Sequence, residues 1–165
     1  MVPETLNSYR LTLEYLRRLV ADVPDADLTR QPVGVANHPA WVVGHLTVSC
    51  QALGGELGLS AWLSPAWEPL FGTGSLPTSD RSAYPPKDEL LAALAAGHAR
   101  ISDRLLVLGD VGMSAPLPDE RYRATLPTVG HAVVHILVGH AAVHVGQVSV
   151  WRRAAGYRPL SEIFA

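Results

Sequence analysis

Residues 128–155 read TVGHAVVHILVGHAAVHVGQVSVWRRAA, and this stretch decides the fold. Residues three and four apart form one stripe along it, the spacing of the buried face of an α-helix. That stripe consists of Val133, Leu137, His140, His144, Gln147 and Trp151. Thr128 suits the cap at its start, and Gly156 follows its end. The stretch therefore predicts a helix over 128–155 that places two imidazoles where leucines would be expected.

A second stripe with a histidine at its centre lies earlier in the chain. Asn37 is predicted to cap a helix that has Pro39 in its first turn and continues to about residue 57. Its buried face consists of Trp41, His45, Val48 and Ala52. Two facing helices of this kind bring three imidazoles into one apolar interior.

The remaining pattern predicts two more helices, over about 3–21 and from Pro86 to about 108, where Gly109 suits a helix end. Residues 58–86 are rich in proline and glycine and carry several aromatic residues, which indicates a long connection packed onto the helices. The fold class is therefore all-α. We expect one domain, 1–165, folded as an antiparallel four-helix bundle with a long crossover connection between helices 2 and 3, and with the tail from residue 157 packed back along the surface.

The three seam histidines, His45, His140 and His144, predict a metal site. A buried neutral imidazole costs stability unless its polar nitrogens have partners, and a divalent ion satisfies three rings at once. Three histidines leave a fourth position open, as in catalytic zinc sites. A metal-free interior in which the histidines bond to one another is the alternative.

Other residues near the seams have two interpretations each. Gln147 either contacts the water or substrate at the site or bonds to another helix. Trp41 and Trp151 are either pocket walls or core. No carboxylate lies on either seam, which argues against a carboxylate-bridged di-iron site and leaves a water or thiol bound to the ion as the nucleophile.

The histidines outside the seams point to packing. His135 lies five residues before His140, a rotation of about 140° in an α-helix, so His131 and His135 are expected to face away, toward a homodimer interface or the bundle. His38 and His98 are expected to be structural or solvated. Cys50 is expected to face away from the site.

Composition excludes several classes of function. The chain has 48% hydrophobic and 17% charged residues, a net charge of −2 and a pI near 6.4. No basic cluster favours nucleic acid, no apolar run suggests a membrane span, and the single cysteine excludes an internal disulfide. We expect a cytoplasmic protein with a small-molecule substrate.

Two stretches resemble the DinB/YfiT-like family. The sequence AWVVGHL (40–46) resembles its motif of a tryptophan before the first metal histidine, and HILVGHAAVHVGQ (135–147) resembles its closing helix. The resemblance implies a divalent transition metal, usually nickel or zinc, on His45, His140 and His144, in a bundle that often dimerises. Ala141 stands where relatives often have an acidic residue, so a supporting carboxylate is not expected there.

What the resemblance implies for function is a metal-dependent hydrolase, or a transferase acting on low-molecular-weight thiols. A non-catalytic protein that binds a small molecule or a metal in the same cavity is the alternative.

Overall fold

The computed structural model describes residues 1–160, and apart from one isolated bridge between Pro116 and Thr128 its regular structure is helical. This confirms the all-α class. The elements in chain order are α1 (Val2–Val20), η1 (Asp25–Asp27), α2 (Pro39–Glu56), α3 (Trp67–Phe71), η2 (Arg81–Ala83), α4 (Lys87–Met113), η3 (Glu120–Tyr122), α5 (Val129–Val134), η4 (His135–His140) and α6 (Ala141–Ala154). Of the expected tail, residues 161–165 lie outside the described part.

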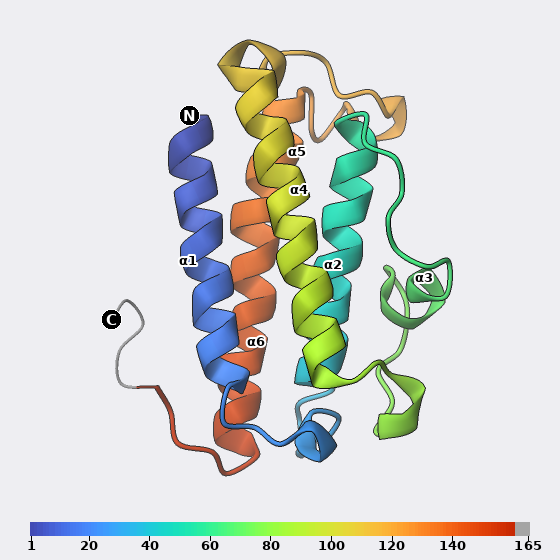
Figure 1. Ribbon diagram of the computed structural model, residues 1–165, viewed down its shortest axis with the longest axis vertical. Coiled ribbons are helices and arrows are strands. Elements are labelled where there is room, and N and C mark those ends of the chain that lie inside the picture. Colours follow the sequence, from blue (N-terminus) through green and yellow to red (C-terminus); the bar gives the residue numbers. More distant parts are fainter. Residues whose placement is uncertain (161–165) are drawn as a thin grey trace.

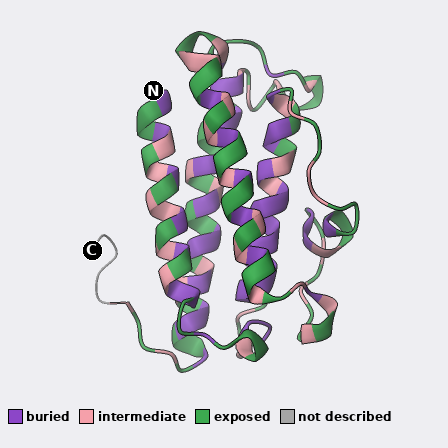
Figure 2. Ribbon diagram, viewed as in Figure 1, coloured by how far each residue is buried: buried purple, intermediate pink, exposed green. Residues whose placement is uncertain are grey.

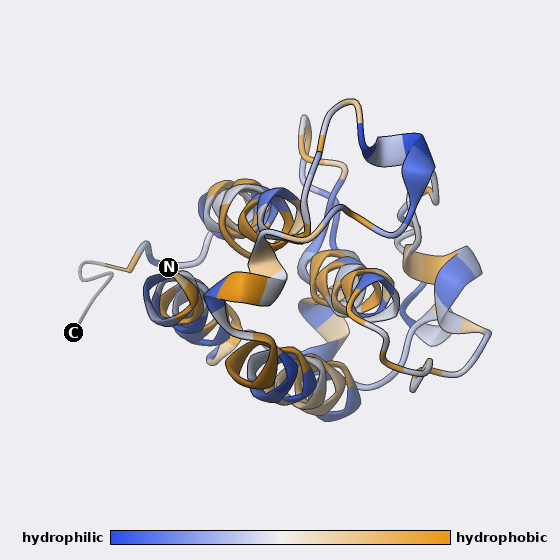
Figure 3. Cartoon of the chain, turned by 90° about the horizontal axis from the view of Figure 1, so that it is seen from above, coloured by the Kyte–Doolittle hydropathy of each residue, from blue (hydrophilic) through white to orange (hydrophobic). Residues whose placement is uncertain are grey.

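Four long helical segments lie side by side within residues 1–160: α1, α2, α4 and the continuous run from α5 to α6 (Figure 1). Seen end-on, they surround a common interior (Figure 3). Their inward faces are buried and their outward faces are mostly exposed (Figure 2). Fully buried side chains come from all four segments; they include Leu16, Val42, Ile101, Leu105, Leu137 and Val148.

The expected fully antiparallel arrangement does not hold, because α2 and α4 run in the same direction (Figure 1). Near the middle of both helices, the Cβ atom of Cys50 lies 3.4 Å from a Cβ built at Gly97. Beyond the end of α2, the Leu57 carbonyl accepts from Arg104 of α4. The physical reason is the long connection after α2, which returns the chain to the end where α2 began. Each segment therefore has one parallel and one antiparallel neighbour.

The connection from residue 57 to residue 86 is packed onto the helices through aromatic side chains. Trp67, Phe71 and Tyr84 are buried, and the Phe71 ring lies 5.1 Å from that of Trp67 and 5.6 Å from that of Tyr84. Gly44 makes this packing possible, because a Cβ at that position would come within 2.2 Å of the Phe71 ring. The connection thus holds α3 against the middle of α2.

The helix ends correct one prediction and refine another. The cap of α2 is His38 and not Asn37: the His38 Nδ1 accepts from the backbone N–H of Trp41. The Asn37 side chain instead donates through Nδ2 to Gln147 on another helix. Gly109 has the positive φ of a helix-ending glycine, but α4 resumes after that break and continues to Met113.

The predicted continuous α-helix over 128–155 contains a π-helical segment, η4, between α5 and α6. Thr128 caps the start of α5, as expected, and its side chain accepts from the His131 N–H. A π-turn closes hydrogen bonds between residues five apart, so it accommodates one extra residue and changes the direction of the side chains within it. This change of register lies at the histidine cluster.

The run 129–154 is long and apolar enough to cross a membrane by length and composition, with a third of the most apolar window buried. Core helices pass the same test. This run packs against α1 and α2 and carries several buried residues, among them His144 and Arg152. One such run is weak evidence for a membrane span.

Candidate metal centre

The structure brings together His45 of α2, His140 at the end of η4 and His144 of α6. One candidate ligand atom from each ring lies within 4.8 Å of those of the other two. The ring centroids are 4.5–5.1 Å apart, and the Nε2 atoms of His45 and His140 are 3.1 Å apart. His45 and His144 are buried, and His140 is half-buried. The site therefore lies between helices and keeps one accessible side at His140.

His45 is held by the connection that follows α2. Its Nδ1 lies 2.7 Å from the Phe71 carbonyl oxygen, which only accepts hydrogen bonds. The proton of a neutral ring is therefore on Nδ1, and the lone pair of Nε2 faces the other histidines. Trp41 stacks on the same ring at 4.6 Å and 8°, and its indole N–H donates to Ser75. The ring has little freedom to rotate.

His144 is held in the same way by a side chain. Its Nδ1 lies 3.0 Å from the Gln147 Oε1, which also accepts from the Asn37 Nδ2 at 3.0 Å. With the amide oxygen turned toward both donors, His144 carries its proton on Nδ1. Gln147 thus orients His144, which is the role of an outer-shell partner, and its bond to Asn37 also joins it to the residues just before α2.

His140 lacks such support, because its Nδ1 is buried with no hydrogen-bond partner among the described residues. Burial, reinforced by the neighbouring rings of His144, His45 and His135, lowers the pKa of His140 to about 4. Burial also lowers the pKa of His144. Both rings are therefore neutral at neutral pH, the form in which histidine binds a metal.

His135 is exposed and is not among the three candidate ligands, but it lies closer to the site than expected. Its ring centroid lies 6.3 Å from that of His140. The expected rotation of about 140° assumed an α-helix, but His135 and His140 are the two ends of the π-helical segment, where residues five apart come to the same side. His131 is exposed, and its Nδ1 pairs with the hydroxyl of Thr128.

The other candidate residues have separate surroundings. Trp151 is fully buried; its indole N–H donates to the Arg30 carbonyl, and its ring stacks with Tyr157. It lies about two turns beyond His144 on the same helix. These contacts are those of a core residue, whereas the contacts of Trp41 place it at the histidines.

The polar residues expected to be structural lie apart from the three rings. Cys50 is buried and lies 2.7 Å from the Tyr9 hydroxyl, and burial raises the pKa of its thiol to about 11. The His98 ring is 5.0 Å from that of Tyr9. His38, expected to be structural or solvated, is completely buried at the cap of α2.

Sequence reasoning missed the Phe71 carbonyl and the Asn37 amide as supports of the site. No pattern marks a backbone carbonyl 26 residues beyond the ring that it orients. The sequence did single out Asn37, because a polar residue before His-Pro is typical of a helix cap. It predicted a cap, however, and not the bond to Gln147.

The fold and the site define a helical protein with a histidine cluster able to hold a metal ion. A family model described as the DinB superfamily matches residues 8–148. The chain belongs to the DinB superfamily, as the two motifs suggested. No curated protein and no solved structure matches the chain.

Proposed function

We propose that the protein is a metal-dependent enzyme acting on small molecules, with a divalent transition metal, zinc or nickel, on His45, His140 and His144. In this proposal the four long segments form a four-helix bundle around the site. The observation that carries the proposal is the convergence of the three rings, two of which are fixed by their Nδ1 atoms so that Nε2 faces inward.

The residues present fit such an ion. Two nitrogen ligands about 2.1 Å from a tetrahedral zinc ion lie about 3.4 Å from each other. The 3.1 Å between the Nε2 atoms of His45 and His140 is close to that value. Without an ion, a neutral His140 can donate to the His45 Nε2 only with its proton on Nε2, which leaves its own buried Nδ1 as an acceptor with no hydrogen-bond partner among the described residues.

The chemistry that the site supports is activation of a small nucleophile. When bound, a metal ion with three histidine ligands acts as a Lewis acid and lowers the pKa of a water or thiol. Burial lowers the pKa of His140 and of His144, hydrogen bonds orient His45 and His144, and Trp41 packs against the rings of His45 and His144. The candidate ligand group contains no carboxylate among the described residues, so the proposal assigns no Asp or Glu as general base. Hydrolysis and thiol S-transfer are the reactions that we propose.

The alternative is a binding protein that uses the same residues without turnover. A groove of about 570 Å³ beside Gln147 gives this alternative its support. Turnover of ester or thiol substrates by the metal-loaded protein would exclude it.

Elemental analysis of the purified, untagged protein tests the metal site. We expect about one equivalent of zinc or nickel in the parent and its loss in His140→Ala. His131→Ala is the matched control, since it removes an exposed histidine from the same helical run and should keep the metal. No bound metal in the parent after loading with zinc and nickel, or equal contents in all three proteins, would refute the proposal.

Partners and location are part of the proposal. We propose a cytoplasmic homodimer with a small-molecule substrate and with no role in binding nucleic acid or membranes. The exposed face of α5 and η4 supports the dimer, because its residues His131, Val134, His135 and Gly139 include no Asp, Glu, Lys or Arg. A bound ion, a substrate and a dimer are each open to direct measurement.

A further inference from the structure

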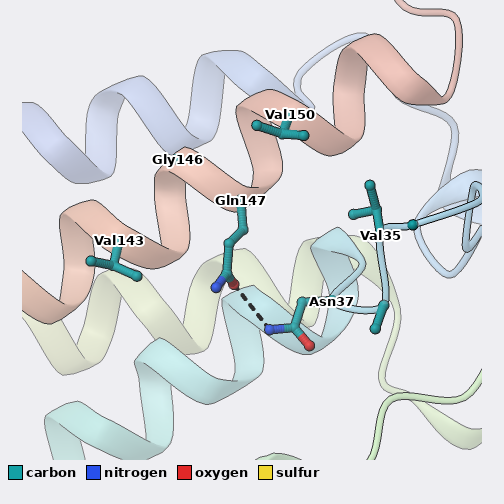
Figure 4. A pocket seen from close by; sticks show the side chains of 8 residues that line it. Val35, Asn37, Val143, Gly146, Gln147 and Val150 are labelled. Atoms are coloured by element: carbon teal, nitrogen blue, oxygen red, sulfur yellow. Dashed lines mark hydrogen bonds between the residues drawn. The ribbon is translucent and has the colours of Figure 1, made fainter.

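A groove lies between the chain before α2 and the outer face of α6, next to the histidines (Figure 4). Its volume is about 570 Å³, within the range of small-molecule sites. Its lining consists of Gly34, Val35, Ala36, Asn37, Val143, Gly146, Gln147 and Val150. Because Gln147 is bonded to His144, a molecule in the groove lies beside the candidate metal centre.

The polar side chains of the groove are two amides with fixed orientations. The Gln147 Oε1 accepts from both the Asn37 Nδ2 and the His144 Nδ1, so the Gln147 amide nitrogen must point elsewhere. Figure 4 shows that nitrogen directed away from Asn37. Among the described residues the structure gives it no partner. It therefore offers N–H donors to an acceptor in the groove.

The rest of the lining is uncharged. All eight residues are glycine, alanine, valine or amides, so none can ionise. An anion that entered this groove would lose its hydration without gaining a cationic partner, which is costly. Val143 and Val150 are 62% and 48% exposed and offer apolar surface to an aliphatic chain.

We propose that the groove binds the uncharged acyl part of the substrate, a neutral carboxamide or ester. Its carbonyl oxygen accepts from the Gln147 amide, and its aliphatic chain lies along Val143 and Val150. The inference rests on the proposed function and names its substrate class. It disfavours substrates that carry a carboxylate or phosphate at this position.

The test compares two ligands that share the same chain and differ in the head group, a neutral amide in hexanamide and a carboxylate in hexanoate, at pH 7. Each is titrated into the ¹⁵N-labelled protein, with and without loaded zinc, and the side-chain amide signals of Asn37 and Gln147 are followed by NMR. We expect saturable shifts with hexanamide and a dissociation constant for hexanoate at least about tenfold higher.

Two aspartate variants locate the binding. Val143→Asp places a charge in the groove wall and should weaken hexanamide binding by about tenfold or more. Val111→Asp is the control, since Val111 is an exposed valine of α4 outside the groove and should leave the titration unchanged. Both changes affect exposed side chains, so both variants should fold.

Three outcomes would overturn the inference: no saturable hexanamide shift, equal binding of hexanoate, or an unchanged titration in Val143→Asp. A fourth contrary outcome would come from sedimentation of the same samples. If a second copy of the chain covered the groove, the parent would be a dimer and Val143→Asp would dissociate it. The zinc content of each sample separates the two proposals. Zinc retained without hexanamide binding refutes the acyl groove alone, and hexanamide binding without zinc retention refutes the metal site alone.

Discussion

His38 starts α2 with a side chain that few helices use as a cap. Its Nδ1 accepts from the Trp41 N–H, and its Nε2 lies 2.9 Å from the Thr78 carbonyl oxygen, to which it donates. The bond from Trp41 requires the neutral ring, because a protonated Nδ1 cannot accept, whereas the bond to Thr78 is compatible with either form. Burial lowers the pKa of His38 to about 4. The cap therefore depends on pH.

In the metal-free protein we expect the free energy of unfolding to fall as the pH is lowered from about 6.5 to 4. The unfolded chain takes up protons in this range while folded His38 resists them, so the stabilisation is complete above 6.5 and is lost toward 4. His140 and His144 add to the same trend, since their pKa values are also lowered. Asn is a good cap that does not titrate, so His38→Asn should reduce the slope by up to about 1.4 kcal/mol per pH unit. Urea unfolding at several pH values measures this, and identical slopes would contradict it.

Gly44 and Gly55 occupy the same helix but differ in their surroundings. A Cβ at Gly44 would lie 2.2 Å from the Phe71 ring, whereas one at Gly55 meets nothing within 4 Å. Gly44→Ala should therefore destabilise the fold by about 1–3 kcal/mol and weaken zinc binding, because the Phe71 carbonyl orients His45. Gly55→Ala should be neutral or stabilising by up to about 1 kcal/mol, with zinc binding unchanged. Thermal melts and zinc titrations of both variants check this, and equal effects would show that the contact with Phe71 is unimportant.

At the scale of elements, Arg152 joins α6 to α1. Its guanidinium is buried and pairs with Asp22 at 2.5 Å, and it also donates to the Leu19 carbonyl at the end of α1. A further bond reaches the carbonyl of Arg158 after α6. These bonds fix the end of α6 against the end of α1.

Arg152→Ala should cost about 2 kcal/mol of unfolding free energy. Several carbonyls and a carboxylate lose their donor, although Asp22 is exposed enough for water to replace part of the loss. The neighbouring Arg153 is exposed, so Arg153→Ala should change stability by less than about 0.5 kcal/mol. Chemical denaturation compares the two, and a small effect at Arg152 would mean that packing alone holds the helix ends.

The elements were largely predictable because hydrophobic spacing and caps such as Thr128 mark them locally. The π-helical segment was not predictable in this way. The spacing of Val133, Leu137, His140 and His144 fits a regular α-helix, and the extra residue is absorbed where α5 and α6 must each pack in their own register. As a result His135 lies closer to His140 than a regular α-helix would place it.

At the scale of the whole molecule, the three histidines could be associated from the sequence because their stripes mark buried faces. The direction of α4 relative to α2 could not be predicted from the sequence. It depends on the path of the connection 57–86, which is set by the packing of buried side chains such as Trp67 and Phe71 onto distant residues. The outer supports of the site, the Phe71 carbonyl and the Asn37 amide, depend on the same long-range packing.

The dimer proposed above predicts the effect of one substitution. Val134 lies on the exposed face of α5 that has no Asp, Glu, Lys or Arg, and it is 40% exposed. Val134→Glu should convert the dimer to a monomer while leaving helical content unchanged, because a buried unpaired charge at an interface is costly. Val111→Glu, at a more exposed valine of α4, should remain dimeric. Sedimentation velocity checks both, and a monomeric parent would refute the dimer.

The bond between His45 and the Phe71 carbonyl has a kinetic consequence. Lifting α3 from α2 would remove the Phe71 carbonyl and free the His45 ring to turn, so local opening of that short helix should speed the release of an ion. The backbone N–H of Gly72 bonds to the Glu68 carbonyl at the end of α3 and reports that opening by hydrogen exchange. An ion held in this way would exchange slowly even where its affinity is modest. The opening of α3 would set its residence time, and the three histidines would set its affinity.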